Sequence, residues 1–391
     1  MTSLAEALAA WATAFAPSPA ELALAERSLH DTLAVMIAAR EHELRPLFER
    51  LGEAGRWAAQ AHVLDYDDLH LPSTAHISAI CVPAALATGG GARAYLAGAG
   101  VMGRLGTALG WDHYRAGWHT TCTAGAPAAA VTASVARGLS PDQTAAAIAL
   151  AIPAAGGVQA AFGTAGKSLQ VGFAVDAGVR AAGLAEAGAT ASPGALEDWF
   201  ALVGGEDILR AGLTDGVRDG LAIKLYPCCY ALQRPIKAMT QVEGVSAGEV
   251  TQITVTTPAS SLKPLIHRQP ITGLQGKFSL EYGVAAALLD GQPDLDSFTD
   301  QAVQRPEAQK LMALAEVITS ESGEGLLAGE VTIEVTTRAG ERRRTSLDLP
   351  PGAPSRPPSS AELCNKLNAC AGAAAEQVSA ATFETAAGLL V

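Results

Sequence analysis

Two patterns of hydrophobic and polar positions divide this chain. Up to about residue 243, apolar residues recur in long runs whose spacing fits helices. Further on, residues 251–257 and 331–337 alternate apolar and polar side chains, as half-buried strands do. The pattern therefore predicts a large helical region followed by a smaller region of mixed α and β structure.

Local signals mark helices in the first region. Ser140, Pro141 and Gln143 combine a serine cap, a proline at the first helical position and a glutamine that completes a capping box. The apolar run at 144–152 predicts a helix buried on nearly all sides, and residues 168–187 predict a second buried helix.

The second region mixes both kinds of element. Helical patterns at 279–290 and 306–318 lie between the two alternating segments, and a turn at 338–341 precedes a third strand at 345–349. A proline-rich linker and a capping box at 359–362 then lead into further helices. The predicted divisions are a helical domain (1–243), an α+β domain (244–355) and C-terminal helices that return to the first domain (356–391).

Composition narrows the function classes. Of 391 residues, 49% are hydrophobic and 17% charged, which suits a chain with a sizeable core. The formal net charge of -12 opposes a nucleic-acid partner, because phosphate binding needs clustered Lys and Arg. It says little about a small anionic ligand, which responds to the local field of a cleft.

Cysteine spacing and the N-terminus point to a reducing, cytoplasmic setting. The six cysteines contain no C-x-x-C and indicate no disulfide framework, zinc site or iron–sulfur cluster. The first residues predict an amphipathic helix capped by Thr2 or Ser3, not a signal peptide. Apolar runs are interrupted before the roughly 20 residues that a membrane span needs, so no membrane partner is expected.

Polar residues are concentrated in segments 64–70, 117–121 and 224–230. Their lysine, histidine, carboxylate and hydroxyl groups suit the binding of a charged carboxylate and the transfer of a proton beside it. Within the first segment, Asp65 is a candidate to orient a histidine or lysine. For Asp67 and Asp68, a solvated helix end is an equally good interpretation.

Histidines fall in two short segments. His76 and His119 are candidates for proton transfer, since imidazole titrates near neutral pH. His70 either binds substrate or is structural. Thr121 either caps the helix that starts beside His119 or bonds a carboxylate, and Tyr114 is a candidate to donate its phenol to an oxyanion.

Lysines supply the candidate positive charges. Lys167 lies in G-T-A-G-K-S, which lacks the four-residue spacing of a phosphate-binding P-loop. It either pairs with a substrate carboxylate or reaches water from a helix end. Lys224 precedes Pro227, and the extended geometry there aims the lysine at a cleft. Cys228 and Cys229 read as packing residues rather than nucleophiles.

Together these motifs resemble the MmgE/PrpD family, which includes 2-methylcitrate dehydratase, cis-aconitate decarboxylase and iminodisuccinate epimerase. The resemblance covers nearly the whole chain. It rests on L-D-Y-D-D at 64–68, His76 before Ser78, G-x-H-x-T at 117–121, Lys167, K-x-Y-P-x-C at 224–229 and K-F-S at 277–279. It implies that Asp65, His76 and His119 lie in the active site with Lys167 and Lys224.

The resemblance also implies a fold. The expected architecture is mainly α, with a large all-helical domain built from both chain ends and an inserted small α+β lid domain. The site would lie in the cleft between them, with Arg268, Lys277 and Ser279 as candidates to close over the substrate. Lys277 is equally well explained as the first residue of a helix. A homodimer through the helical domain is expected on the same ground.

The chain departs from the family pattern at Gln233, where a histidine is common, and at Lys237, where an aspartate is common. Gln233 can hydrogen-bond a substrate but cannot shuttle a proton. Arg234 beside it either contacts a carboxylate or lies on the surface.

The expected function is a lyase of the dehydratase type that needs no cofactor or metal and acts on a small di- or tricarboxylic acid. Lysines would stabilise the charge that develops as a proton leaves alpha to a carboxylate. The same site could instead support an isomerase or a decarboxylase. A catalytically silent carboxylate-binding protein is the alternative from another class.

Overall fold

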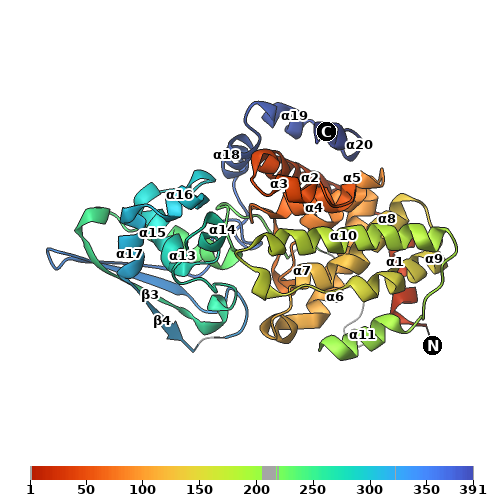
Figure 1. The fold of residues 1–391 in the computed structure, drawn as a ribbon, viewed down its shortest axis with the longest axis horizontal. Helices are drawn as coiled ribbons and strands as arrows, with labels where there is room; N and C mark the ends of the chain where they lie inside the picture. The colour runs from red at the N-terminus through yellow and green to blue at the C-terminus, as the bar shows by residue number, and fades with distance from the viewer. Residues whose placement is uncertain (1, 205–216, 218–219, 322, 391) are drawn as a thin grey trace.

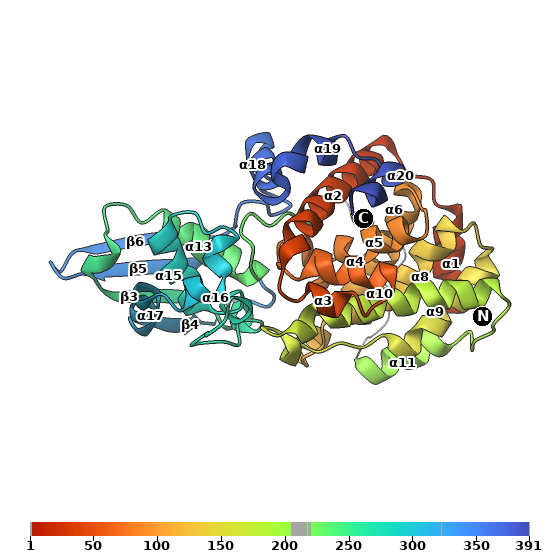
Figure 2. The same ribbon diagram turned by 45° about the horizontal axis from the view of Figure 1, so that its top comes forward.

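The computed structural model describes residues 2–204, 217, 220–321 and 323–390. Figures 1 and 2 show two lobes, a larger helical lobe and a smaller one that holds the main sheet. The C-terminal helices return to lie along α2 of the larger lobe. The fold is mainly α, as predicted, whereas the domain boundaries and the role of the smaller lobe as a lid stay predictions.

Helices build the larger lobe. They are α1 (Leu4–Ala14), α2 (Pro19–Ala38), α3 (Arg45–Phe48), α4 (Glu53–His62), α5 (Ser78–Ala87), α6 (Ala92–Arg115), α7 (Thr120–Thr123), α8 (Gly125–Ala136), α9 (Pro141–Ala151), α10 (Ala165–Glu186), α11 (Ala195–Val203), α18 (Ser360–Ala371), α19 (Ala375–Ser379) and α20 (Phe383–Ala386). Ser3, Ser140 and Ser359 cap α1, α9 and α18 in capping boxes, which confirms those helix starts.

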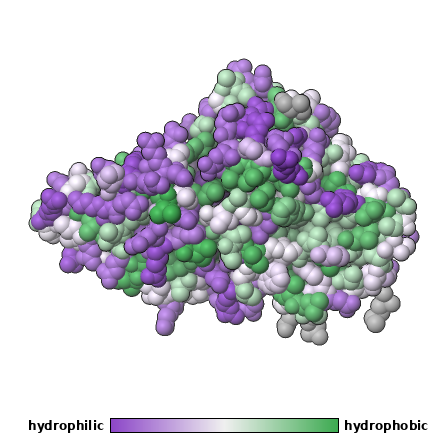
Figure 3. Space-filling model, in the orientation of Figure 1, coloured by the Kyte–Doolittle hydropathy of each residue, from purple (hydrophilic) through white to green (hydrophobic). Residues whose placement is uncertain are grey.

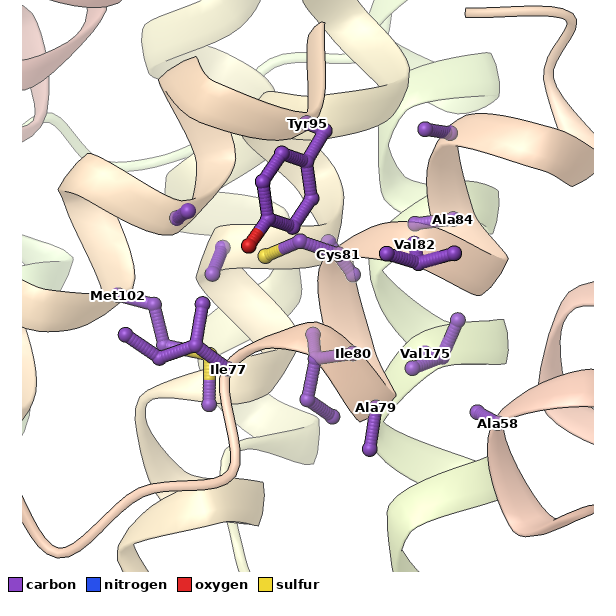
Figure 4. Packing of buried hydrophobic residues seen from close by; sticks show 14 of the residues in the cluster. Ala58, Ile77, Ala79, Ile80, Cys81, Val82, Ala84, Tyr95, Met102 and Val175 are labelled. Atoms are coloured by element: carbon purple, nitrogen blue, oxygen red, sulfur yellow. The ribbon is translucent and has the colours of Figure 1, made fainter. Parts of the chain in front are cut away.

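Small aliphatic side chains fill the core of this lobe. In Figure 4, Tyr95 lies over Cys81, with Ile77, Ile80 and Met102 below, and all five side chains are fully buried. Alanines occupy many of the remaining core positions. Helices can therefore approach closely, because little side-chain volume separates their backbones.

The two helices that were predicted to be buried differ in exposure. Helix α9 buries most of residues 144–151, which confirms the first prediction, whereas α10 exposes Phe173 (58%) and Leu184 (48%) on one side. The prediction of a second buried helix at 168–187 was therefore wrong for one face of α10. Its other face packs on α8 and α4.

The smaller lobe contains a four-stranded sheet in the order β4-β3-β5-β6. Its strands are β3 (Val250–Pro258), β4 (Ala315–Ser320), β5 (Val331–Thr337) and β6 (Arg342–Leu347). Strand β3 pairs parallel to β4 and antiparallel to β5, and β6 pairs antiparallel to β5. The third predicted strand exists but begins at Arg342 rather than 345.

One element was predicted wrongly. The helix expected at 306–318 ends at Ala313 as α17 (Pro306–Ala313), and the following residues form the edge strand β4. Val317 pairs there with Val255 of β3. Partly buried and exposed side chains alternate along most of residues 315–320, as is usual in an edge strand. Strand β3 supplies the backbone groups with which this strand pairs.

Helices cover the sheet. The helices of this lobe are α13 (Tyr230–Thr240), α14 (Gly273–Gly276), α15 (Leu280–Asp290), α16 (Asp300–Val303) and α17. Helix α15 confirms the helix expected at 279–290, with Ser279 as its cap. Helix α13 packs on β5, β6 and α15, so its buried residues belong to the core of the smaller lobe.

A short pair of strands joins distant parts of the chain. Strands β1 (Leu69–His70) and β2 (Leu221–Ala222) pair antiparallel and bring two distant parts of the chain together. All six cysteines are free thiols. Among the described residues, helices long and apolar enough to cross a membrane are absent. On the face shown in Figure 3, polar residues cover much of the smaller lobe and apolar residues gather nearer the middle.

Candidate active site

Asp65 lies at the centre of a buried polar cluster between the lobes. It follows α4 in a left-handed conformation (φ 52°), which non-glycine residues adopt rarely and aspartate more readily than most. Its Oδ1 atom lies 2.5 Å from Nζ of Lys224 and 3.4 Å from Nζ of Lys167. Burial opposes ionisation, but these two lysines hold the pKa of Asp65 well below its usual range.

Lys224 reaches Asp65 from the segment between β2 and α13. Its Nζ also donates to the backbone carbonyl of Asp65 at 2.8 Å, and the side chain is fully buried. Burial alone would lower its pKa, yet the carboxylates of Asp65 and Asp67 raise it above the usual value. Lys224 is therefore held as a cation, out of any helix, as predicted from Pro227.

Asp67 anchors two histidines. Its Oδ2 atom lies 2.7 Å from Nδ1 of His62 and 3.0 Å from Nδ1 of His76, although the second contact lacks hydrogen-bond alignment. Nε2 of His62 accepts from Nζ of Lys167 at 2.5 Å. Burial lowers the pKa of His62, and that of His76 to about 3, so both rings are neutral near pH 7.

His119 completes a group of three imidazoles. Its ring centroid lies 5.5 Å from that of His62 and 6.4 Å from that of His76. It is the residue before α7, as predicted, and its Nδ1 atom meets the Gln170 amide at 2.8 Å. Burial, helped by the charge of Lys167, keeps its pKa well below the usual value.

The smaller lobe contributes residues to this cluster. Lys277 lies between α14 and α15, and its Nζ donates to the carbonyls of Leu64 (2.9 Å) and Pro227 (2.7 Å). Burial lowers its pKa to about 8. Phe278 stacks on Phe162 at 5.0 Å between ring centroids. The ring of Phe162 also contacts His119, at 5.1 Å.

A small cavity remains beside these groups. Its volume is about 10 Å³, close to the minimum that holds one water molecule. The residues that line it come from both lobes and are His62, Val63, Asp65, Gly163, Thr164, Lys167, Ser168, Leu274, Lys277 and Phe278. Surface hollows of about 540 and 470 Å³ lie elsewhere and are lined by neither histidine nor lysine. The chemistry of the buried cluster, rather than the size of a cavity, marks the candidate site.

The structure thus brings together Asp65, His76, His119, Lys167, Lys224 and Lys277. Two further candidates support this group. Thr121 accepts a hydrogen bond from the backbone N–H of His76 at 3.1 Å, so its hydroxyl positions the histidine segment. Tyr114 is buried close enough for the charge of Asp65 to contribute to its raised pKa.

Other candidates lie apart from the cluster. His70 contacts Ser73 at 2.7 Å and packs toward Gly103 and Gly220. The amide of Gln233 accepts from two backbone N–H groups of the 224–228 segment and donates to its carbonyls, so it holds that segment in place. Arg268 is exposed.

Two more residues take structural positions. Ser279 caps α15 by accepting from the N–H of Tyr282. The guanidinium of Arg234 donates to carbonyls at 327–329 and 348 and to Ser261. This buried side chain therefore connects several segments of the smaller lobe.

The sequence reasoning missed His62 and Gln170. His62 was visible as a histidine three residues before Asp65, at the end of an apolar helical run. For Asp67, the sequence supported a functional residue and a solvated helix end equally well. Its contacts with two histidines favour the functional interpretation. Asp68 points elsewhere, to the N–H and hydroxyl of Ser78.

His62, Asp67 and His76 could also hold a metal ion, since one ligand atom from each lies within 4.8 Å of the others. However, Nδ1 of His62 already bonds Asp67, and Nζ of Lys167 lies 2.5 Å from the same ring. A metal ion there would have to replace the His62–Asp67 hydrogen bond, and the ammonium group of Lys167 would repel it. The arrangement fits hydrogen-bonded imidazoles better than metal ligands.

Comparison with known proteins identifies the family of this chain. Models of the MmgE/PrpD N-terminal domain and C-terminal domain match residues 54–203 and 226–389. The chain belongs to the MmgE/PrpD family, which confirms the resemblance drawn from its motifs.

Two fungal relatives add detail. Cis-aconitate decarboxylase of Aspergillus terreus is 29% identical over 318 residues, which cover 69% of this chain and 64% of the relative. The cis-aconitate decarboxylase-like protein oryM of Aspergillus oryzae is 27% identical over 282 residues, 61% of this chain and 58% of the relative. The chain thus matches less than two thirds of either relative's length.

Proposed function

We propose that the protein is a cofactor-independent lyase that acts on a small di- or tricarboxylic acid by removing a proton alpha to a carboxylate. The observation that carries this proposal is the convergence of Lys167 and Lys224 on Asp65, beside three neutral imidazoles. Below about pH 8, the three ammonium groups of Lys167, Lys224 and Lys277 outnumber the carboxylates of Asp65 and Asp67, which leaves one excess positive charge for an anionic substrate.

The lysines would stabilise the developing negative charge. Loss of an alpha proton places charge on the carboxylate oxygens, and buried ammonium groups interact with it strongly because little water screens them. Asp65 would orient both lysines before the substrate binds. The small cavity implies that Leu274, Lys277 and Phe278 move aside to admit the acid.

His76 is the favoured base. The nearby Asp67 carboxylate favours a proton on Nδ1 of His76, which leaves the lone pair on Nε2 for the substrate proton. Hydroxide would leave as water by taking a proton from the Lys277 ammonium, whose pKa of about 8 suits a general acid near neutral pH.

Decarboxylation is the second candidate. One fungal relative is named a cis-aconitate decarboxylase and the other a cis-aconitate decarboxylase-like protein. Loss of carbon dioxide would leave a carbanion that the same lysines stabilise, and a proton would then be delivered to carbon. Dehydration and decarboxylation share the site and differ in which bond of the acid breaks.

The experiment is a panel of citrate, 2-methylcitrate, cis-aconitate and aspartate-derived acids, assayed on purified protein in deuterated water without added metal. Water loss supports the dehydratase, release of carbon dioxide the decarboxylase, and exchange without either an isomerase. Tight binding without exchange would leave only a carboxylate-binding protein. Lys224→Met serves as the control for turnover by contaminants.

A further inference from the structure

His119 is held from three sides. Its backbone N–H donates to the carbonyl of Gly157 at 3.0 Å, and its ring packs edge-on to Phe162. Its Nδ1 atom faces the amide of Gln170, one turn into α10. The ring position is therefore set by parts of the chain that lie outside the aspartate segment.

The orientation of the Gln170 amide follows from a single neighbour. Oε1 accepts from the backbone N–H of Val158 at 3.0 Å, while Nε2 lies 3.3 Å from the carbonyl of the same residue. A flipped amide would oppose N–H to N–H and C=O to C=O, and both bonds would be lost. The side of Gln170 that meets His119 is thus the N–H side, at 2.8 Å.

The thiol of Cys122 faces the same ring nitrogen. Sγ of Cys122 lies 3.4 Å from Nδ1 of His119, and burial raises the pKa of this thiol, which keeps its proton. The Gln170 N–H directed at Nδ1 requires a lone pair there, and a thiol that keeps its proton can donate to the same lone pair. In the neutral ring the proton must then reside on Nε2.

We propose that Gln170 is a positioning residue that holds neutral His119 in its Nε2–H tautomer, so that His119 donates a hydrogen bond to the substrate and does not act as the base. The tautomer itself does not depend on any activity. Its catalytic meaning rests on the proposed function, in which His119 would stabilise the charged intermediate and His76 would take the proton.

The test is two-bond ¹H–¹⁵N NMR of histidine-labelled full-length protein, which distinguishes the two neutral tautomers. The His119 signals are assigned by their loss in His119→Asn. Wild-type His119 is expected as Nε2–H. Gln170→Glu replaces the donor by an acceptor, and His119 is then expected to move to Nδ1–H. Gln159→Leu removes a glutamine that supports the same loop without contacting His119, and the tautomer should not change.

A wild-type His119 protonated on Nδ1, or an unchanged tautomer in folded Gln170→Glu, would overturn the proposal. If that variant fails to fold, the wild-type spectrum alone decides. On an acid that is turned over, Gln170→Glu is expected to lower kcat roughly 100-fold with little change in KM. A protein with the expected tautomer but no turnover would contradict the proposed function and leave the tautomer assignment standing.

Discussion

Nζ of Lys224 lies 2.5 Å from Oδ1 of Asp65, and neither side chain is more than 3% exposed. We predict that Lys224→Met lowers kcat/KM by at least roughly 100-fold, because the charge that opposes the developing carbanion is lost. The buried Asp65 carboxylate would keep only the more distant Lys167, so unfolding should also become easier, by about 3 kcal/mol. Steady-state kinetics and urea denaturation measure the two effects.

A double variant separates catalysis from stability. Asp65→Asn combined with Lys224→Met removes both charges, so much of the lost free energy of unfolding should return while turnover does not. Recovery of turnover in the double variant would show that Lys224 serves only to neutralise Asp65.

The histidines offer a matched pair. His119→Gln is expected to lower kcat by roughly 100-fold or more, since the group that faces the substrate is removed. His70→Gln should keep turnover within about threefold, because His70 lies against Ser73 and outside the cluster. Equal losses in the two variants would contradict the site as described.

The pKa of Lys277 predicts that turnover depends on pH. Its pKa is lowered by burial to about 8, so the side chain is cationic below that pH and neutral above it. Turnover that needs the ammonium group should therefore fall as pH rises through about 8. Lys277→Arg, which stays charged, should move the fall to higher pH. A wild-type profile that stays flat to about pH 10 would exclude this role.

Asp68 predicts an effect on stability alone. Burial raises its pKa to about 7, and hydrogen bonds from Ser78 oppose only part of that rise. Because the unfolded carboxyl ionises near pH 4, the folded protein binds the extra proton between the two values. The contribution of this group is therefore greatest at low pH and is lost as pH rises through about 7.

Asp68→Asn should remove that dependence. Between pH 5 and 7, the wild-type free energy of unfolding should fall relative to that of the variant by up to about 1.4 kcal/mol per pH unit. Denaturation curves of both proteins across this range give the difference directly. Parallel curves would show that the Asp68 carboxyl is ionised throughout.

Local chemistry explains which elements the sequence could predict. The capping boxes at Ser3, Ser140 and Ser359 involve residues three apart, so they are readable without tertiary structure. Strand β4 was missed because its pairing with β3 joins residues far apart in sequence, and a short apolar run fits a helix equally well.

In the site, too, the sequence could not reveal contacts that depend on the tertiary structure. Asp65, Lys167 and Lys224 were found because their motifs match a family pattern, and the structure brings them together. Residue type alone could not show that the side-chain amide of Gln233 hydrogen-bonds nearby backbone groups. Nor could it reveal that His62, at the end of a helix, meets Asp67.

The most direct measurement is a crystal structure of the protein with a bound tricarboxylate such as citrate. The account predicts that one carboxylate contacts Nζ of Lys167 and Lys224, with a second within hydrogen-bond distance of Nε2 of His119. Citrate bound on another face, or a metal ion held by His62, Asp67 and His76, would contradict it.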